Sequence, residues 1–394
     1  MNKPSFSKYY VLQSLISALF HVPVLVIFMN DQLGDVSAVA TLLFVKTMSN
    51  LIFEIPTGIV ADYCGRKKSA GFGVFLAACS TLIYFLSGDY SWLFVSQVLF
   101  GLSEAFVSGS LTSLIFENVE KEKPGSFSEV QRNLSLISSL SLFVSFNIGS
   151  LAYSLTKTVP FLLSTICSFL GLLWFFVIKD STSKEESSTN SETFMKSLSG
   201  QSSSLWHLLL STGTLGGLFY ALYLFVFPLL LKAAQVPEEF FGMIFSAGVI
   251  CFGLGGKYSG LGVKNNRYLE VVAPLAIVSL LVLWVFFPSA AVTVFVLFAF
   301  RFVTGSYNVA RDVEMNYTIT SSKHRTSILS LSSGLNRGIS ALFIVMLGGL
   351  MKYYGQQGLV LFSGSIVLLV GLISFLASYF LKLPSTIDKG ASAP

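Results

Sequence analysis

Residues 58–68 read GIVADYCGRKK and decide the fold. They lie between two long apolar runs, 36–60 and 69–87, and place one acid and three bases within a few positions. Two helices joined by so short a segment need a tight reversal, and Gly65 can adopt the positive φ that a side chain disfavours. Asp62 needs a base or a helix N-terminus as its partner, because an unpaired carboxylate is costly at a membrane boundary. The stretch therefore predicts a membrane hairpin with a charged tip.

The composition excludes a soluble enzyme. Hydrophobic residues make up 53% of the chain and charged residues 11%, against about 25% charged residues in ordinary globular domains. The net charge of +5 is explained by membrane topology, so we expect no nucleic-acid partner. The four cysteines lie far apart without a C-x-x-C pair, which predicts neither metal nor disulfide. We expect no catalytic residues and no cofactor, since no G-x-x-x-x-G-K-S/T phosphate loop is present.

Twelve apolar runs are long enough to cross a bilayer as helices of about 20 residues. Their length and uniform hydrophobicity exclude barrel strands. The first run lacks a clear A-x-A cleavage site and is longer than a signal-peptide core, so we expect it to be retained. The predicted spans are 9–30, 36–60, 69–87, 91–116, 130–155, 158–178, 205–231, 238–256, 268–287, 289–310, 326–352 and 356–381.

The spans divide into two halves of six. Residues 179–204 are serine-rich, charged and nearly free of large apolar side chains, which predicts a cytoplasmic linker. The string FVSGS at 106–110 returns as FVTGS at 302–306, in the corresponding helix of the second half. Such a recurrence is expected after duplication of a six-helix unit. We therefore predict an all-α membrane protein of twelve transmembrane helices, with a half at 1–178 and a half at 205–394.

The distribution of the 25 bases predicts the orientation. With both termini inside, eighteen of them lie on the cytoplasmic side. Four others lie within spans or at their ends, namely Lys46, Arg132, Arg301 and Arg337. The three outside are Lys157, Lys232 and Lys352. This asymmetry follows the positive-inside rule, so we expect a multi-pass protein of the cytoplasmic membrane with cytoplasmic termini.

Ionisable residues inside the spans are the candidate functional residues, because each costs several kcal/mol unless it is paired or hydrated. Five of them lie about 15–18 Å from the span ends, near the middle of the bilayer, at a rise of about 1.5 Å per residue. Glu54 is shallower and follows Lys46 along roughly one helix face. The five are His21, Lys46, Glu104, Arg301 and Arg337.

The loop of residues 58–68 resembles the signature of the major facilitator superfamily, which links the second and third helices on the cytoplasmic side. Tyr63 stands where that family usually has a base. Two patterns of its drug/proton antiporters are altered, since Gln97 replaces an arginine and the fifth span lacks a Gly-Pro pair. The residues that match the signature are Gly58, Ala61, Asp62, Gly65, Arg66 and Lys67.

The resemblance implies a gating latch in which the acid of the loop contacts the start of the eleventh helix. The alternative is that the bases of the loop only fix topology. We expect Arg132 either to pair with Glu117 or Asp62 at the cytoplasmic rim or to anchor the surface. The implied latch residues are Gly58, Asp62, Gly65, Arg66, Lys67 and Arg132.

In that family, helices one, four, seven and ten line a central cavity, and helices two, five, eight and eleven form the seam between halves. The resemblance places His21, Glu104 and Arg301 in the cavity. It places Lys46, Glu54 and Arg337 at the seam. Either the bases hold an anionic or zwitterionic substrate, or they pair with the two acids and set when these carry protons. The structural alternative is two buried ion pairs, Lys46–Glu54 and Arg301–Glu104, with His21 bonded to a neighbouring helix.

We expect a secondary active transporter that exports a small amphipathic or anionic compound in exchange for protons. Glu104 and Glu54 are the candidate proton-coupling residues. The candidate substrate-binding residues are His21, Lys46, Arg301 and Arg337. Uptake of a small metabolite by proton symport is the alternative, and a non-transporting receptor or an enzyme on the same fold is the rival class. The expected partners are the solute, protons and the lipid bilayer, with the monomer as the working unit.

The topology is tested with cysteines introduced at Asp89 and Ser191. We expect a membrane-impermeant thiol reagent to label the cysteine at Asp89 from outside intact cells, and the cysteine at Ser191 only after lysis. The four native cysteines are first replaced by serine. Labelling of both positions from outside would overturn the predicted orientation.

Overall fold

A computed structural model describes residues 6–178, 203–258, 269–318 and 325–380. Every regular element in these ranges is a helix, and the predicted linker lies outside them apart from its last two residues. The earlier elements are α1 (Ser7–Ile16), the 3-10 turn η1 (Val22–Val24), α2 (Leu25–Leu33), α3 (Val36–Cys64), α4 (Arg66–Leu86), α5 (Tyr90–Glu122), α6 (Phe127–Leu155) and α7 (Val159–Trp174). The later ones are α9 (Ser203–Ala221), the π-helix η2 (Leu222–Val226), α10 (Phe227–Ala233), the 3-10 turn η3 (Glu238–Phe240), α11 (Phe241–Lys257), α12 (Leu269–Phe286), α13 (Ala290–Thr318) and α14 (Arg325–Phe380).

The described helices account for each of the twelve predicted spans. Eight segments are long and apolar enough to cross a membrane, and three shorter apolar helices fall in three further spans, of which the first also contains α1. The longest segment, Leu331–Tyr379, covers the last two spans. Gly355 divides it with φ 65° and ψ −165°, a conformation outside the helical region. This glycine lies between the predicted spans 326–352 and 356–381, so the predicted boundary is confirmed.

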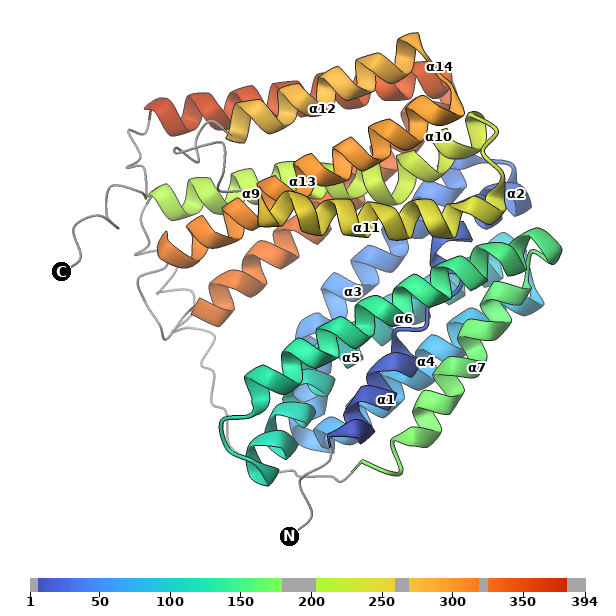
Figure 1. The fold of residues 1–394 in the computed structure, drawn as a ribbon, viewed down its shortest axis with the longest axis vertical. Coiled ribbons are helices and arrows are strands. Elements are labelled where there is room, and N and C mark those ends of the chain that lie inside the picture. Colours follow the sequence, from blue (N-terminus) through green and yellow to red (C-terminus); the bar gives the residue numbers. More distant parts are fainter. Residues whose placement is uncertain (1–5, 179–202, 259–268, 319–324, 381–394) are drawn as a thin grey trace. The chain divides into compact units, whose positions relative to one another are not determined.

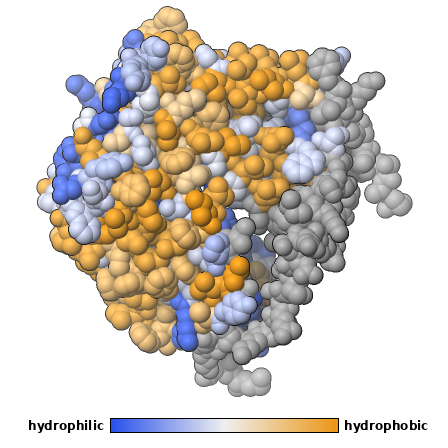
Figure 2. Space-filling model, turned by 180° about the vertical axis from the view of Figure 1, so that it is seen from behind, coloured by the Kyte–Doolittle hydropathy of each residue, from blue (hydrophilic) through white to orange (hydrophobic). Residues whose placement is uncertain are grey.

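The outer surface of the helices is apolar. Figure 2 shows hydrophobic side chains over most of the visible described surface. Leu155, Phe176 and Phe286 are each more than 70% exposed, which a water-soluble protein rarely permits in such number. These side chains suit a lipid environment, and the chain is a multi-pass membrane protein.

The chain forms two compact units, which we call unit 1 and unit 2. Unit 1 comprises residues 1–186 together with 237–246, and unit 2 comprises residues 187–236 together with 247–394. The predicted division at the linker had assigned 237–246 to the second half. These residues pack on α6, because Gly242 approaches the carbonyl of Phe146 so closely that a Cβ atom would overlap it.

In unit 1, α5 packs against both α3 and α4 (Figure 1). Gly101 makes the contact with α3 possible, since a Cβ atom there would overlap the carbonyl oxygen of Lys46. Asn50 donates from its side-chain nitrogen to the carbonyl of Gly101 at 3.4 Å. Glu104 follows Gly101 by three residues, so this close approach brings its carboxylate to α3.

In unit 2, α9 packs against α14, and α12 packs against both α13 and α14 (Figure 1). Gly217 of α9 lies against the backbone of Asn336. Gly371 of α14 lies against Pro274 of α12. Small residues at both contacts let the helices approach closely. The van der Waals packing that results is a main source of attraction between helices in lipid.

Each unit contains one interrupted membrane helix. The span 9–30 was predicted as one helix, but α1 ends at Ile16 and α2 begins at Leu25. Pro23 lies in the break and lacks the N–H that a continuous helix would use. In unit 2, the π-helix η2 lies directly before Pro228. Neither interruption was predicted, because proline also occurs inside continuous helices.

The contact at Gly101 is tested by Gly101→Ala, with Gly109→Ala as the control on the same helix. A methyl group at Gly101 overlaps the backbone of α3, so we expect a loss of about 1–3 kcal/mol. The position of Gly109 has open space, and alanine there is expected to be neutral or to stabilise the helix by up to about 1 kcal/mol. The measurement is the midpoint of thermal unfolding in detergent. Equal midpoints for the two variants would show that the contact is not tight.

Candidate functional site

The structure joins two of the predicted midplane residues in an ion pair. The Lys46 Nζ of α3 lies 2.8 Å from the Glu104 Oε1 of α5. The lysine side chain is 15% exposed and the glutamate side chain 43% exposed. Phe100 covers the ammonium, with its ring centroid 5.1 Å from Nζ. The site therefore holds a screened cation and an accessible carboxylate, a pairing different from the Lys46–Glu54 pair considered above.

His21 belongs to the packed interior of unit 1. Its side chain is 2% exposed, and its Nδ1 lies 2.9 Å from the hydroxyl of Ser164 on α7. Its ring stacks on Phe161 with centroids 5.6 Å apart and meets Phe100 edge-on at 5.7 Å. The hydrogen bond with Ser164 is the one expected under the structural alternative for His21, in which the ring bonds a neighbouring helix.

Arg301 in unit 2 is held between two aromatic rings. Its guanidinium carbon lies 4.0 Å from the ring centroid of Tyr223 and 4.4 Å from that of Phe252. Its Nε donates to the carbonyl of Gly248 at 3.3 Å. Tyr223 lies in the π-helix η2, a type of irregularity that often accompanies functional sites. Within the described part of unit 2, no carboxylate forms an ion pair with this guanidinium.

The charged loop has the predicted backbone. Gly65 separates α3 from α4 with φ 95°, so the predicted positive φ is confirmed. Arg66 of α4 forms an ion pair with Glu117 of α5. Glu117 is thus paired with Arg66 rather than with Arg132, which lies exposed at the start of α6. The side chain of Asp62 lies outside the described residues, and its role in the latch stays a prediction.

The other predicted residues lie within helices. Gly58 faces open space, so packing does not require a glycine there. Lys67 is half-buried at the start of α4. Glu54 on α3 and Arg337 on α14 are also half-buried. Their proposed roles in gating, proton coupling and substrate binding stay predictions.

Unit 2 contains a buried charge network that the sequence did not reveal. Arg311 of α13 lies 2.8 Å from a carboxylate oxygen of Glu270 on α12 and 2.7 Å from one of Glu314. The side chains of Arg311 and Glu270 are 2% and 1% exposed. His207 of α9 lies 3.9 Å from Glu270 and bonds the carbonyl of Ser374 at 2.9 Å.

Two features hid this network. The predicted span ended at residue 310, which placed Arg311 among loop bases, whereas α13 continues to Thr318. Glu270 lies near the start of the predicted span 268–287 and was not among the candidate residues. The signal available in the sequence was the i, i+3 spacing of Arg311 and Glu314, which puts both on one helix face.

Gln97 replaces the arginine of the drug/proton antiporter pattern with a neutral contact. The side chain is 1% exposed. Its Nε2 donates to the hydroxyl of Tyr84 at 2.6 Å. The position therefore contributes a hydrogen bond inside unit 1 and no charge.

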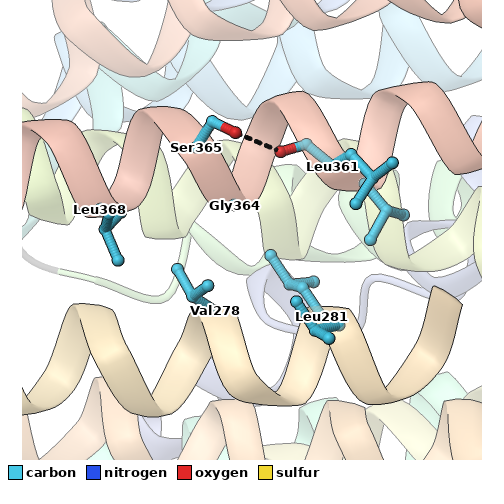
Figure 3. Close-up of a pocket in the computed structure, with 8 residues that line it drawn as sticks. Val278, Leu281, Leu361, Gly364, Ser365 and Leu368 are labelled. Atoms are coloured by element: carbon cyan, nitrogen blue, oxygen red, sulfur yellow. Dashed lines mark hydrogen bonds between the residues drawn. The ribbon is translucent and has the colours of Figure 1, made fainter. Parts of the chain in front are cut away.

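A pocket between α12 and the second half of α14 is apolar (Figure 3). Its volume is about 150 Å³, and Val278, Leu281 and Leu368 contribute to its lining. The hydroxyl of Ser365 donates to the carbonyl of Leu361 in its own helix at 2.9 Å. The pocket thus offers little to orient a polar solute. Nor do the described residues contain a group of three potential metal ligands.

Comparison with known proteins identifies the family. The family model of the Major Facilitator Superfamily matches residues 10–313. The chain belongs to the major facilitator superfamily. It is therefore a transporter of that family, with its helical membrane fold. Over 172 residues it is 24% identical to the uncharacterized MFS-type transporter YxaM of Bacillus subtilis strain 168, a match that covers 44% of this chain and 42% of that protein.

Solved structures of other transporters share the fold. The nucleoside transporter NupG has a TM-score of 0.78 at 13% identity, over 95% of this chain and 99% of its own. A bacterial homolog of the human lysosomal transporter Spinster, inward-facing and occupied, has a TM-score of 0.75 at 16% identity, over 97% and 99%. A POT family transporter in complex with 5-aminolevulinic acid has a TM-score of 0.73 at 13% identity, over 97% and 98%. At these identities the likeness establishes the fold alone.

The buried network of unit 2 is tested by Glu270→Ala, with Glu239→Ala as the control at an exposed position. Removing Glu270 leaves the Arg311 guanidinium without one of its two carboxylates in a buried site. We expect a loss of about 3–5 kcal/mol, the usual cost of an uncompensated buried charge. The measurement is the unfolding midpoint of each purified variant, and a double variant with Arg311→Met is expected to regain part of the loss. A Glu270→Ala protein as stable as the control would contradict a structural role for the network.

Proposed function

We propose that this transporter couples the movement of protons to the movement of a small solute, with Glu104 carrying the proton. The ion pair between Glu104 and Lys46 carries the proposal. The carboxylate is the more exposed partner, so protons reach it more readily than they reach the ammonium. A carboxylate that is both accessible and balanced by one neighbouring cation is suited to alternate between two charge states.

In this proposal, a proton and the Lys46 ammonium compete for the same carboxylate. While Glu104 is ionised, the pair is neutral and its attraction holds α3 to α5. When Glu104 takes up a proton, Lys46 keeps its charge and loses the negative charge that lies 2.8 Å from its Nζ. Losing a counter-charge in a partly buried site is costly, and an oxygen of the solute or of entering water can offset that cost. Proton binding and solute binding are linked in this way.

The interrupted helices support a site at membrane depth in each unit. Irregular backbone is tolerated at that depth where it is packed in protein or lines a cavity. Pro-interrupted helices at corresponding positions of two halves are a sequence-level pointer to the binding site of a transporter. Here the break before Leu25 and the π-helix η2 occur in the first membrane helix of each predicted half.

Arg301 is the proposed solute contact of unit 2. Two aromatic faces and the Gly248 carbonyl fix the guanidinium plane, which leaves its terminal N–H groups as the donors available to a solute. Arginine keeps its charge at every physiological pH. We therefore assign Arg301 to solute binding and not to proton transfer.

We further propose that the two six-helix halves move relative to each other, with the loop of residues 58–68 as the gating latch. Export in exchange for protons, the direction expected from the sequence, and proton-driven uptake use the same coupling chemistry. They differ in which gradient drives the solute. In either case the protein is not an enzyme, works as a monomer and resides in the cytoplasmic membrane with both termini inside.

The test compares Glu104→Gln with Glu129→Gln, the same change at an exposed position of α6. Uridine, dialanine and 5-aminolevulinic acid are first screened for stabilisation of the purified protein, because similar structures are transporters of nucleosides or bind peptide or that acid. The protein is then reconstituted in vesicles with a pH-sensitive dye inside. We expect Glu104→Gln to lose uphill transport and proton movement but to retain exchange of labelled for unlabelled solute, which needs no net proton transfer. The control is expected to keep both activities.

Two outcomes would overturn parts of this proposal. Uphill transport by Glu104→Gln at the wild-type rate, with unaltered pH dependence, would make Glu54 the next candidate. Binding of a solute without any flux in the wild-type protein would favour the non-transporting receptor. Reversing the imposed pH gradient separates export from uptake, since only one direction of the proton gradient then drives accumulation inside the vesicles.

A further inference from the structure

Unit 1 also contains a cavity of about 400 Å³ between α1, α5 and α6, and neither Lys46 nor Glu104 lines it. Its volume lies within the range of about 300–1,000 Å³ that holds small-molecule ligands. The four other lining residues are aliphatic. The six polar side chains that line it are Gln13, Ser108, Thr112, Gln131, Ser135 and Ser138.

None of the ten lining residues is charged. A site that takes an ion out of water normally supplies a counter-charge, because an unpaired ion in an apolar surrounding is very costly. This lining supplies hydroxyl and amide groups in place of charges. It therefore favours an uncharged polar solute over the anionic compound that was one of the two kinds of solute expected from the sequence.

Most of the hydroxyl hydrogens of the cavity are already used. Ser108 and Thr112 donate to the carbonyls of Ala105 and Ser108, each at 3.3 Å. Ser135 donates to the carbonyl of Gln131 at 3.1 Å. A hydroxyl that has donated its hydrogen can only accept. These side chains therefore present lone pairs to the cavity.

The amide of Gln13 also has an acceptor available to an occupant of the cavity. Its nitrogen donates to the hydroxyl of Ser17 at 3.0 Å, which leaves its carbonyl oxygen to accept. Ser17 in turn lies 2.8 Å from the hydroxyl of Ser138. Gln13, Ser108, Thr112 and Ser135 thus present acceptors that hydrogen-bond donors of an occupant can satisfy.

The cavity adjoins the proposed proton site. Ser108 follows Glu104 by four residues on α5, so both lie on one helix face about 6 Å apart along the axis. Val107, another lining residue, follows Glu104 by three. The end of the cavity at Val107 and Ser108 therefore lies about one helical turn from Glu104 along α5.

We propose that this cavity binds an uncharged solute that carries several hydroxyl or N–H donors, of the size of a nucleoside or a hexose. The inference rests on the proposed function, since it names the class of solute that the transporter moves. The hydroxyl groups and Gln13 accept the solute's donors, and the aliphatic side chains cover its less polar face.

Binding is measured on the purified full chain at one fixed pH, without membrane or gradient. The uncharged probes are uridine and glucose, and the charged probes are benzoate, 5-aminolevulinic acid and tetraethylammonium. We expect an uncharged probe to bind and the ions not to compete with it. Loss of one hydrogen bond is expected to weaken binding roughly three- to tenfold, so Ser138→Ala and Thr112→Val are each predicted to show that loss.

Two variants keep the test specific. Ser139→Ala removes an exposed hydroxyl on α6 that donates to the carbonyl of Ser135, outside the cavity lining, and it is expected to bind as the wild type does. Thr112→Ser retains the acceptor that Thr112→Val removes, and it is expected to keep most of the affinity. Thermal unfolding without ligand confirms that each variant is folded.

The outcomes separate this inference from the proposed coupling. Binding of ions alone, binding of neither uncharged probe, or equal affinity in Ser138→Ala and Ser139→Ala overturns the assignment of the cavity, whatever Glu104→Gln does. Binding of an uncharged probe that depends on Ser138 and Thr112 supports it even where Glu104→Gln retains uphill transport, a result that would overturn the coupling alone.

Discussion

A charged side chain at bilayer depth has no bulk water to solvate it, so the protein must supply its partner. The described structure meets this requirement in three ways. Lys46 has a carboxylate, Arg301 has two aromatic faces, and Arg311 has two carboxylates, of which that of Glu270 is buried. The aromatic faces cannot change their charge, and the carboxylate of Glu270 is sealed from solvent. Only the partner of Lys46 is both ionisable and substantially exposed, which is why we assign coupling to that pair.

Close backbone contacts at glycine place these groups. In lipid, helices gain little from hydrophobic burial, so small residues and tight packing decide which faces meet. Gly101 lets α5 approach the backbone of Lys46, and Gly149 of α6 lets the carbonyl of Phe20 approach it. The second contact covers backbone in the break between α1 and α2. The interrupted helix is therefore supported by a neighbouring helix rather than left facing lipid, as the low polarity of the bilayer requires.

Hydropathy predicted the twelve spans because each span is a long run of apolar residues suited to lipid, and Gly65 could be predicted as a turn because it lies between two such runs. Partners were harder to predict. Counting residues gives the depth of a side chain but not the face of the neighbouring helix, so Lys46 and Glu104 were placed at one level without being paired. The helix interruptions were missed because Pro56 and Pro274 lie inside continuous helices. Whether a proline breaks a helix depends on what neighbouring helices offer to the freed carbonyls.

The repeated string shows how the two units can share a scaffold and differ in chemistry. Gly305, in the second copy, packs against the carbonyl of Phe252, whereas Gly109, its counterpart in the first copy, faces open space. Phe252 is also one of the two rings that hold Arg301. The tight contact in unit 2 thus fixes Phe252, which holds the Arg301 guanidinium. In unit 1, Gly109 has open space and directly follows Ser108, which lines the acceptor-rich cavity. In the proposed coupling, Glu104 changes its charge and Arg301 does not. The proposed proton carrier lies in unit 1 and the proposed fixed cation in unit 2, so protonation of Glu104 alters the charge of unit 1 alone.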